Sequence, residues 1–296
     1  MTFDIAMIGA LLAATLRLAV PVIVAALGEL VIERSGVLNL GIEGTMLSGA
    51  YGGYIVALST GSPWLGILAG LAVGAAVGIL LAVLMVVLRT DQIITGLAFA
   101  ILASAVTTYL FELSYTVGAA PSRIAGIDLG EITAVAVVSL LTVWIVLQRT
   151  SHGMSLTAIG EDPASADALG LRVNRTRFVA VVLGNAVIGM AGALLVCGPL
   201  GLFVQNVTGG RGWIALALVV FARWKPVPVL FGGLLFGFCD ALRLRLQTAA
   251  PDDFPYEIFI ALPYVVTILA LVIGGRSGLA PSALGIPYHR GSPARR

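Results

Sequence analysis

The sequence predicts an all-α, polytopic membrane protein, and its composition and the length of its apolar segments support this fold class. Of the 296 residues, 59% are hydrophobic and 11% are charged, whereas a soluble domain has about 25% charged residues. The mean hydropathy is +1.03. Apolar residues form continuous runs such as 67–88, which do not alternate with polar residues as the strands of a membrane β-barrel do.

Apolar segments long enough to cross a bilayer recur along the whole chain. A span needs about 20 residues, and the hydropathy pattern predicts about eight to ten transmembrane helices. The candidates lie near 5–31, 37–58, 64–88, 92–111, 132–148, 178–198, 212–222, 227–246 and 256–273. The first segment contains Arg17, which could break its helix, and the seventh is too short to cross alone. We therefore expect a single transmembrane domain that covers 1–296.

The basic residues predict the orientation, because short cytoplasmic loops retain Lys and Arg. If the loop at about 149–177 is cytoplasmic, alternation of the spans places most of the 17 basic residues on the same side. The C-terminal tail, about 276–296, is then also cytoplasmic. With an odd number of spans the N-terminus lies outside. If the number of spans is wrong by one, only the N-terminus changes sides.

Several function classes are excluded by the residues that the chain contains. A formal net charge of +2 without a basic, aromatic-rich stripe excludes a nucleic-acid-binding protein. Cys197 and Cys239 lie in apolar runs and are expected to be buried thiols. His152 and His289 lack metal-ligand spacing, so no metal site is expected. Lys225 is the only lysine and no glycine loop precedes it; the chain therefore lacks a P-loop, and no catalytic residue is assigned.

Glycines at intervals of four predict close helix packing in the third apolar segment. They are Gly66, Gly70, Gly74 and Gly78. Residues four apart share a helix face, so a second helix can approach this strip closely. Gly233 and Gly237 form a shorter version in the eighth segment. Ordinary helix packing is the favoured interpretation, and a sliding or subunit-contact surface is the alternative.

Two polar residues enter the second apolar segment. Asn39 and Glu43 are four residues apart and share a helix face. Glu43 would lie roughly 9 Å inside the span, where an acid is costly and normally faces a polar interior or a partner. Gly36, Gly41 and Gly44 permit a broken helix at this point. A functional role for Glu43 and a structural one, as a cap or salt bridge to a neighbouring element, both remain open.

The loop 149–177 has the sequence pattern of short helices. Residues 155–161 can form one, Pro163 suits the first turn of a second that continues through 164–169, and Gly170 ends it. A soluble partner protein could bind such a helix. The residues alone favour a solvated connector.

Three runs in this order resemble a known family. They are ERSGVLNLGIEGTMLSGA (33–50), AIGEDPASADALGLRVNRTRF (158–178) and GGRGWIALALVVFARWKPVPVLFGGLLFGFCDALRLRLQ (209–247). Together they resemble the permease subunits of bacterial ABC importers for nucleosides and simple sugars, within the branched-chain amino acid and sugar permease group. Trp213 and Lys225 are small departures from the pattern.

The resemblance implies a multi-pass subunit of the bacterial plasma membrane that works by alternating access. It implies an ABC ATPase subunit that holds ATP and Mg²⁺, a second related permease in a heterodimer, and an extracytoplasmic substrate-binding lipoprotein; this chain itself would hold no cofactor. The loop resembles the coupling helices that contact the ATPase, through Gly160, Glu161, Asp162, Pro163, Ala164, Ala166 and Gly170.

Polarity within the apolar segments points to groups on the translocation path. Asn39, Glu43 and, in the sixth segment, Asn185 are the candidates. A secondary transporter driven by an ion gradient is the main alternative, with Glu43 or Asp240 as its ion site. Asp240 and Arg243, however, have the spacing of a simple ion pair. A scaffold or intramembrane enzyme is a third class, and the sequence has no catalytic constellation that supports it.

Overall fold

The fold is all-α, as predicted, in a computed structural model that describes residues 5–114, 121–249, 265 and 280–290. The helices in these residues are α1 (Ile5–Arg34), α2 (Ile42–Thr60), α3 (Pro63–Ala82), α4 (Gln92–Ser114), α5 (Leu129–Arg149), α6 (Ser151–Glu161), α7 (Pro163–Ala168), α8 (Val173–Leu195), α9 (Arg211–Phe221) and α10 (Pro226–Ala249). Two π-helical turns, Val83–Val87 and Val196–Leu200, extend α3 and α8.

Six of the described helices are long and apolar enough to cross a membrane, so the chain is a multi-pass membrane protein. These segments are Ile8–Arg34, Pro63–Val87, Gln92–Ser114, Leu129–Arg149, Val173–Leu200 and Pro226–Leu246. Each coincides with a predicted span. The second predicted span corresponds to the 19-residue α2, and the seventh to α9, which has only 11 residues. The ninth, 256–273, lies outside the described residues apart from position 265.

One expectation about the first span is wrong. The helix α1 is not broken at Arg17 but continues over 30 residues to Arg34. Its C-terminal part lies in the core, where Ile23, Leu27 and Leu30 are at most 1% exposed. Arg17 itself is exposed, so the continuous helix carries its charge without burying it. The helix ends at Arg34, and the non-helical segment 35–41 follows it.

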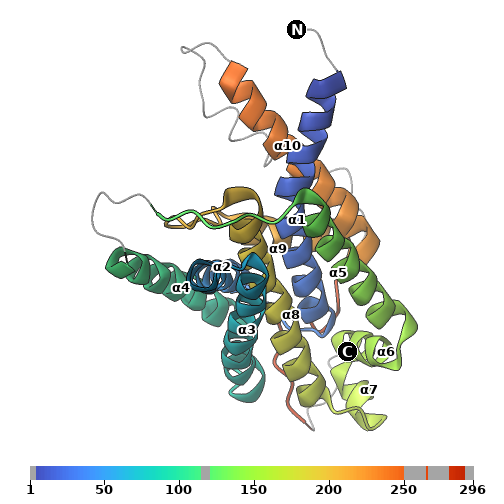
Figure 1. Ribbon diagram of the computed structural model, residues 1–296. Coiled ribbons are helices and arrows are strands. Elements are labelled where there is room, and N and C mark those ends of the chain that lie inside the picture. Colours follow the sequence, from blue (N-terminus) through green and yellow to red (C-terminus); the bar gives the residue numbers. More distant parts are fainter. Residues whose placement is uncertain (1–4, 115–120, 250–264, 266–279, 291–296) are drawn as a thin grey trace.

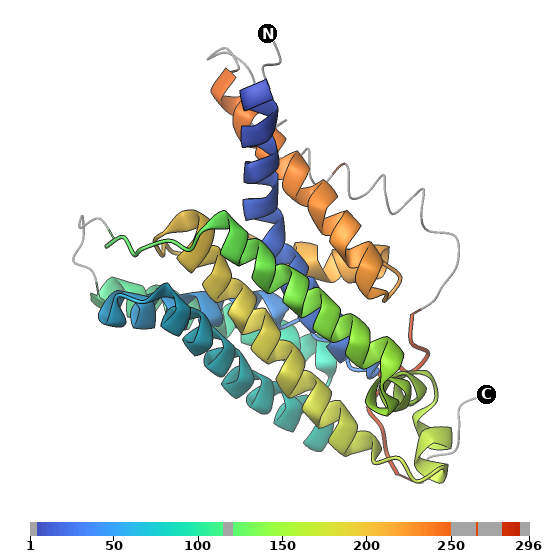
Figure 2. The ribbon, with the colours of Figure 1, turned by 45° about the vertical axis from the view of Figure 1, so that its right-hand side comes forward.

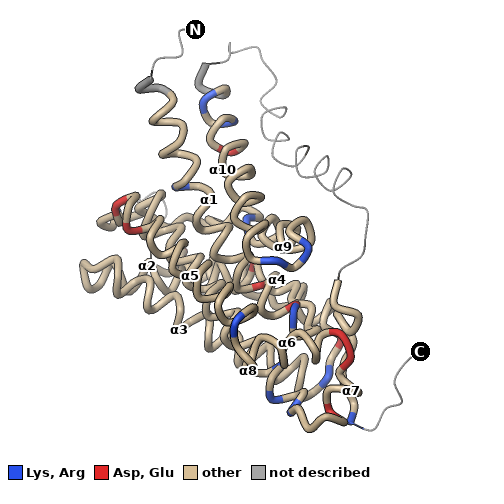
Figure 3. The backbone as a smooth tube through the Cα atoms, turned by 90° about the vertical axis from the view of Figure 1, so that its right-hand side faces the viewer, with Lys and Arg blue, Asp and Glu red and all other residues tan. Residues whose placement is uncertain are grey.

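Helix α8 lies at the centre of the bundle and packs against α1, α2 and α3. Figures 1 and 2 show α3 alongside α8, and α1 crossing to meet α10. The short helices α6 and α7 lie at one end of the bundle, away from the first turns of α1 (Figure 1). In Figure 3 many of the positions of charged residues lie along the backbone near these short helices, whereas most positions of the long helices are uncharged.

The glycine strip of α3 packs against α8, which confirms helix packing as its role. A Cβ atom added at Gly70 would lie 2.4 Å from the Cβ of Ala193, and one at Gly74 would lie 2.3 Å from the carbonyl oxygen of Asn185. In α10, a Cβ at Gly237 would lie 2.6 Å from the Cβ of Ala19 in α1. Backbones therefore approach closely where side chains are absent.

We expect Gly74→Ala to destabilise the protein by about 1–3 kcal/mol, because the added methyl group meets the backbone of α8. Gly9→Ala is the matched control: it also lies in a helix, and a Cβ there has no neighbour within 4 Å. Thermal unfolding in detergent micelles measures the difference. Equal melting temperatures for the two variants would contradict the close α3–α8 contact.

Candidate functional site

The segment 35–41 between α1 and α2 brings Asn39 into the core. Gly36 has φ 84°, a conformation that favours glycine, and it turns the chain after α1. Asn39 is fully buried. Its Nδ2 donates to Oε2 of Glu29 at 3.0 Å and to Oδ1 of Asn185 at 3.3 Å. Its Oδ1 accepts a hydrogen bond from the amide of Gly41 at 3.1 Å.

Asn185 in α8 belongs to the same buried polar cluster. Its Oδ1 also accepts a hydrogen bond from the hydroxyl of Thr45 at 2.9 Å, and its Nδ2 donates to the carbonyl of Val181 at 2.9 Å. The structure therefore brings together two of the three candidate path residues, Asn39 and Asn185, between α1, α2 and α8. Their amides are neutral hydrogen-bonding groups. Whether they line a path for substrate stays a prediction.

The expected shared helix face of Asn39 and Glu43 is wrong, because α2 begins only at Ile42 and Asn39 lies in the non-helical segment before it. Glu43 lies in the first turn of α2 and contacts a different part of the chain. Its Oε1 accepts hydrogen bonds from the hydroxyl of Thr208 at 2.5 Å and from the amide of Gly210 at 2.9 Å. Its Oε2 accepts one from the amide of Gly212 at 2.7 Å. The carboxylate thus caps the N-terminus of α9, where free amides and the helix dipole favour a negative charge. This geometry favours the structural interpretation of Glu43, and its role on the path stays a prediction.

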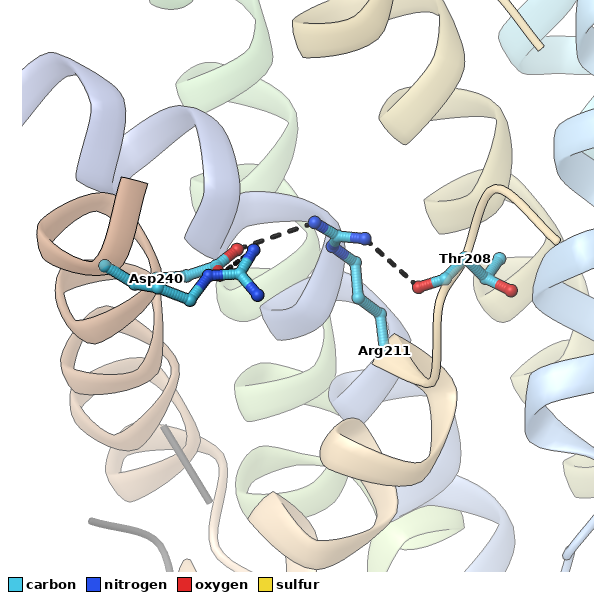
Figure 4. Close-up of polar contacts among 4 residues, drawn as sticks. Thr208, Arg211 and Asp240 are labelled. Carbon is cyan, nitrogen blue, oxygen red and sulfur yellow. Dashed lines mark hydrogen bonds and ion pairs between the residues drawn. The ribbon is translucent and has the colours of Figure 1, made fainter. Parts of the chain in front are cut away.

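Asp240 in α10 forms the predicted ion pair with Arg243 and a second one that was not predicted. Its Oδ1 lies 3.0 Å from Nη2 of Arg243, and its Oδ2 lies 3.5 Å from Nη2 of Arg211 at the start of α9. Nη1 of Arg211 donates to the carbonyl of Thr208 at 3.2 Å. Figure 4 shows this chain of contacts. Because two guanidinium groups share the carboxylate of Asp240, it is poorly suited to bind a transported cation.

The loop after α5 forms two short helices, as the sequence predicts, but α6 begins at Ser151 rather than at residue 155. Asp162 caps α7: its Oδ1 accepts hydrogen bonds from the amides of Ala164 and Ser165 at 3.1 and 3.2 Å. A hydrogen bond from the side chain of Ser165 holds the pKa of Asp162 below its usual value. Gly170, with φ 87°, follows the helix. Ala166 is buried, in contact with an apolar cluster that includes Ile159 and Val173.

The structure adds residues that the sequence did not single out. Glu29 and Glu33 in α1 are at most 1% exposed and lie inside the bundle. Glu33 accepts a hydrogen bond from the indole of Trp224 at 2.5 Å. Arg177, at the start of α8, is 2% exposed and binds carbonyl groups of distant segments. The partners of Glu33 and Arg177 are remote in sequence, so the sequence alone does not distinguish these residues from charged residues at the membrane surface.

Residues 11–271 match the family described as the permease component of the branched-chain amino acid transport system. The chain belongs to this permease family. The match includes the buried polar cluster, the Glu43 cap, and α6 and α7.

The similarity to known proteins covers nearly the whole permease. A Haloferax volcanii protein named as a glucose ABC transporter permease, TsgC13, is 40% identical, and the match covers 95% of this chain and 97% of TsgC13. The guanosine ABC transporter permease protein NupQ of Bacillus subtilis is 32% identical, with 94% and 96% covered. The solved structure of PsaBC from Streptococcus pneumoniae in complex with Fab has a TM-score of 0.51 at 16% identity, with 92% and 91% covered, which shows a shared fold.

Proposed function

We propose that this permease is the membrane subunit of an ABC importer and moves nucleosides or related simple sugars into the cell by alternating access. The observation that carries this proposal is the end-to-end similarity to permeases named for guanosine and glucose transport. Both solutes are neutral and rich in hydroxyl groups. The neutral amides of Asn39 and Asn185 suit such solutes, since an amide can both donate and accept hydrogen bonds.

ATP supplies the energy through a separate subunit in this proposal. The chain has no P-loop and is not itself an enzyme; ATP and Mg²⁺ bind to the partner ATPase. The contact with the ATPase is made by α6 and α7, through Gly160, Glu161, Asp162, Pro163, Ala164, Ala166 and Gly170. Two features support this assignment. The two short helices lie at one end of the bundle (Figure 1), and α7 is held in shape by its own cap.

The remaining subunits are proposed from the family. A second, related permease completes the translocation path, and an extracytoplasmic lipoprotein delivers the substrate. The end that carries α6 and α7 faces the cytoplasm, because an ATPase must reach it. Ala283 binds the carbonyl of Gly160 in α6, so residues 280–290 lie on the cytoplasmic side as well. Specificity rests largely with the binding lipoprotein, so that a weakly polar path is sufficient.

Uptake of labelled nucleosides and sugars by cells with and without this gene tests the function. We expect ATP-dependent uptake of a nucleoside or sugar that is lost on deletion, is restored by the wild-type gene, and survives collapse of the ion gradient. Uptake that survives ATP depletion but stops when the gradient collapses would support an ion-driven secondary transporter instead. The two arginines on Asp240 argue against that alternative.

A further inference from the structure

Residues 281–290, which we name the C-terminal strap, run across the end of α6. The amide of Ala283 donates to the carbonyl of Gly160 at 2.9 Å. The amide and the hydroxyl of Ser282 donate to Oε2 of Glu161 at 3.3 and 3.1 Å. Ala283 is 6% exposed, so the strap is packed against the bundle at this point. The strap thus binds the last turn of the helix proposed to contact the ATPase.

The same strap binds the turn between α1 and α2. The amide of Gly285 donates to the carbonyl of Gly36 at 3.2 Å. Arg177 connects the two segments from α8: its Nη1 donates to the carbonyl of Ile286 at 2.9 Å, and its Nε donates to the carbonyl of Ser35 at 3.0 Å. These bonds to a charged donor are among the stronger ones in proteins, and they are costly to break in a buried site.

The end of α6 also touches the end of α1 directly. A Cβ atom added at Gly160 would lie 2.3 Å from the carbonyl oxygen of Arg34. The end of α6, the α1–α2 turn and the strap therefore form one hydrogen-bonded unit, with Arg177 as its cross-link. The α1–α2 turn leads within three residues from Gly36 to Asn39 and the buried polar cluster.

Two exposed contacts extend the strap at its far end. Nε of Arg290 lies 3.3 Å from Oδ2 of Asp167 in α7, and Nη1 of Arg89 lies 3.2 Å from Nδ1 of His289. Exposed pairs of this kind contribute little, about 0–1 kcal/mol. The bonds of Ala283, Gly285 and Arg177 are therefore the ones that hold the strap in register; the bond from Arg177 to Ser35 is buried, and the bond to Ile286 is partly buried.

We propose that the C-terminal strap is part of the coupling apparatus, with Arg177 as a positioning residue. When the ATPase displaces α6 and α7, the strap and Arg177 carry the displacement to the α1–α2 turn and so to the residues next to Asn39. Because hydrogen bonds fix the register of these segments, α6 cannot slide past the turn without breaking them. This inference rests on the proposed contact between the ATPase and α6–α7.

Two truncated chains test the strap in the assembled transporter. A chain that ends at residue 280 lacks the strap, whereas a chain that ends at residue 290 keeps it and serves as the control. Each is assembled in nanodiscs with its partner subunits, and ATPase activity is measured with and without substrate-loaded binding protein. We expect the shorter chain to lose about tenfold in stimulated activity, within the usual range of coupling free energies, with the basal activity retained. The longer chain should match the full-length protein.

Arg177→Gln in the full-length chain provides a second test if the shorter chain fails to assemble. Arg175→Gln removes the same charge from an exposed position of the same helix and is the matched control. Hydrogen exchange in the ATP-trapped state distinguishes coupling from simple support. In the wild type, exchange should change in both 158–168 and 35–41; in Arg177→Gln, it should change only in 158–168. A change in both segments, with stimulation within twofold of wild type, would overturn the inference.

A replacement of residues 161–166 by a linker separates this inference from the function on which it rests. If the linker abolishes stimulation but Arg177→Gln does not, the strap has no coupling role and the ATPase contact stands. If stimulation survives the linker, α7 does not couple ATP hydrolysis to transport, and the strap inference, which rests on that contact, is wrong as well.

Discussion

Replacement of residues 161–166 by a Gly/Ser linker of equal length should lower substrate-stimulated ATPase activity of the assembled transporter about tenfold. The replacement removes the Asp162 cap and the buried contact of Ala166, so α7 cannot stay helical. Because a flexible linker changes shape when the ATPase moves against it, the movement is not transmitted to the membrane helices. Activity is measured in nanodiscs with purified partner subunits, and uptake in cells should fall in parallel.

Asp162→Asn is the matched control for the linker. Asparagine caps helices about as well as aspartate does, so this variant removes one charge from α7 and keeps its shape. We expect its stimulated activity to remain within twofold of wild type. Normal stimulation in the linker variant would mean that α7 does not couple ATP hydrolysis to transport. A loss in both variants, with the basal activity intact, would mean that the charge of Asp162, rather than the helix, makes the contact.

Removal of the Glu43 carboxylate should have the largest effect on stability. In Glu43→Ala, the hydroxyl of Thr208 and the amides of Gly210 and Gly212 lose their acceptor. Each unsatisfied buried donor costs about 1–3 kcal/mol, so we expect a loss of about 3 kcal/mol or more. Thermal unfolding in nanodiscs measures the loss, and hydrogen exchange should increase in residues 208–212.

Two further variants make the test of Glu43 specific. Glu112→Ala removes an exposed acid from the end of α4 together with one exposed hydrogen bond, from Nε2 of Gln205, and should change stability by about 1 kcal/mol or less. Glu43→Gln keeps a single acceptor oxygen and should fall between Glu43→Ala and wild type. If Glu43→Ala unfolds normally and keeps residues 208–212 protected but loses transport, Glu43 acts on the translocation path and not as the cap of α9.

The membrane helices and the short helices α6 and α7 could be predicted from the sequence because both depend on local properties. A helix surrounded by lipid must be apolar along its whole length, which is visible without knowledge of its neighbours. The stop at Gly170, the start at Pro163 and the pair Asp240–Arg243 involve residues within one or two turns. The glycines of α3 likewise predicted a close helix contact, but they did not predict that α8 is the helix in contact.

The partners of the polar residues were decided only by the tertiary structure. Asn39 meets Asn185 across 146 positions of sequence, and Glu43 meets Gly212 across 169. A carboxylate inside a span must find donors, but its own sequence neighbourhood does not say which element supplies them. The same holds for Arg177, whose carbonyl partners lie 142 and 109 residues away. Apolar burial is a property of a single segment, whereas a buried hydrogen bond is a property of two segments that only the fold brings together.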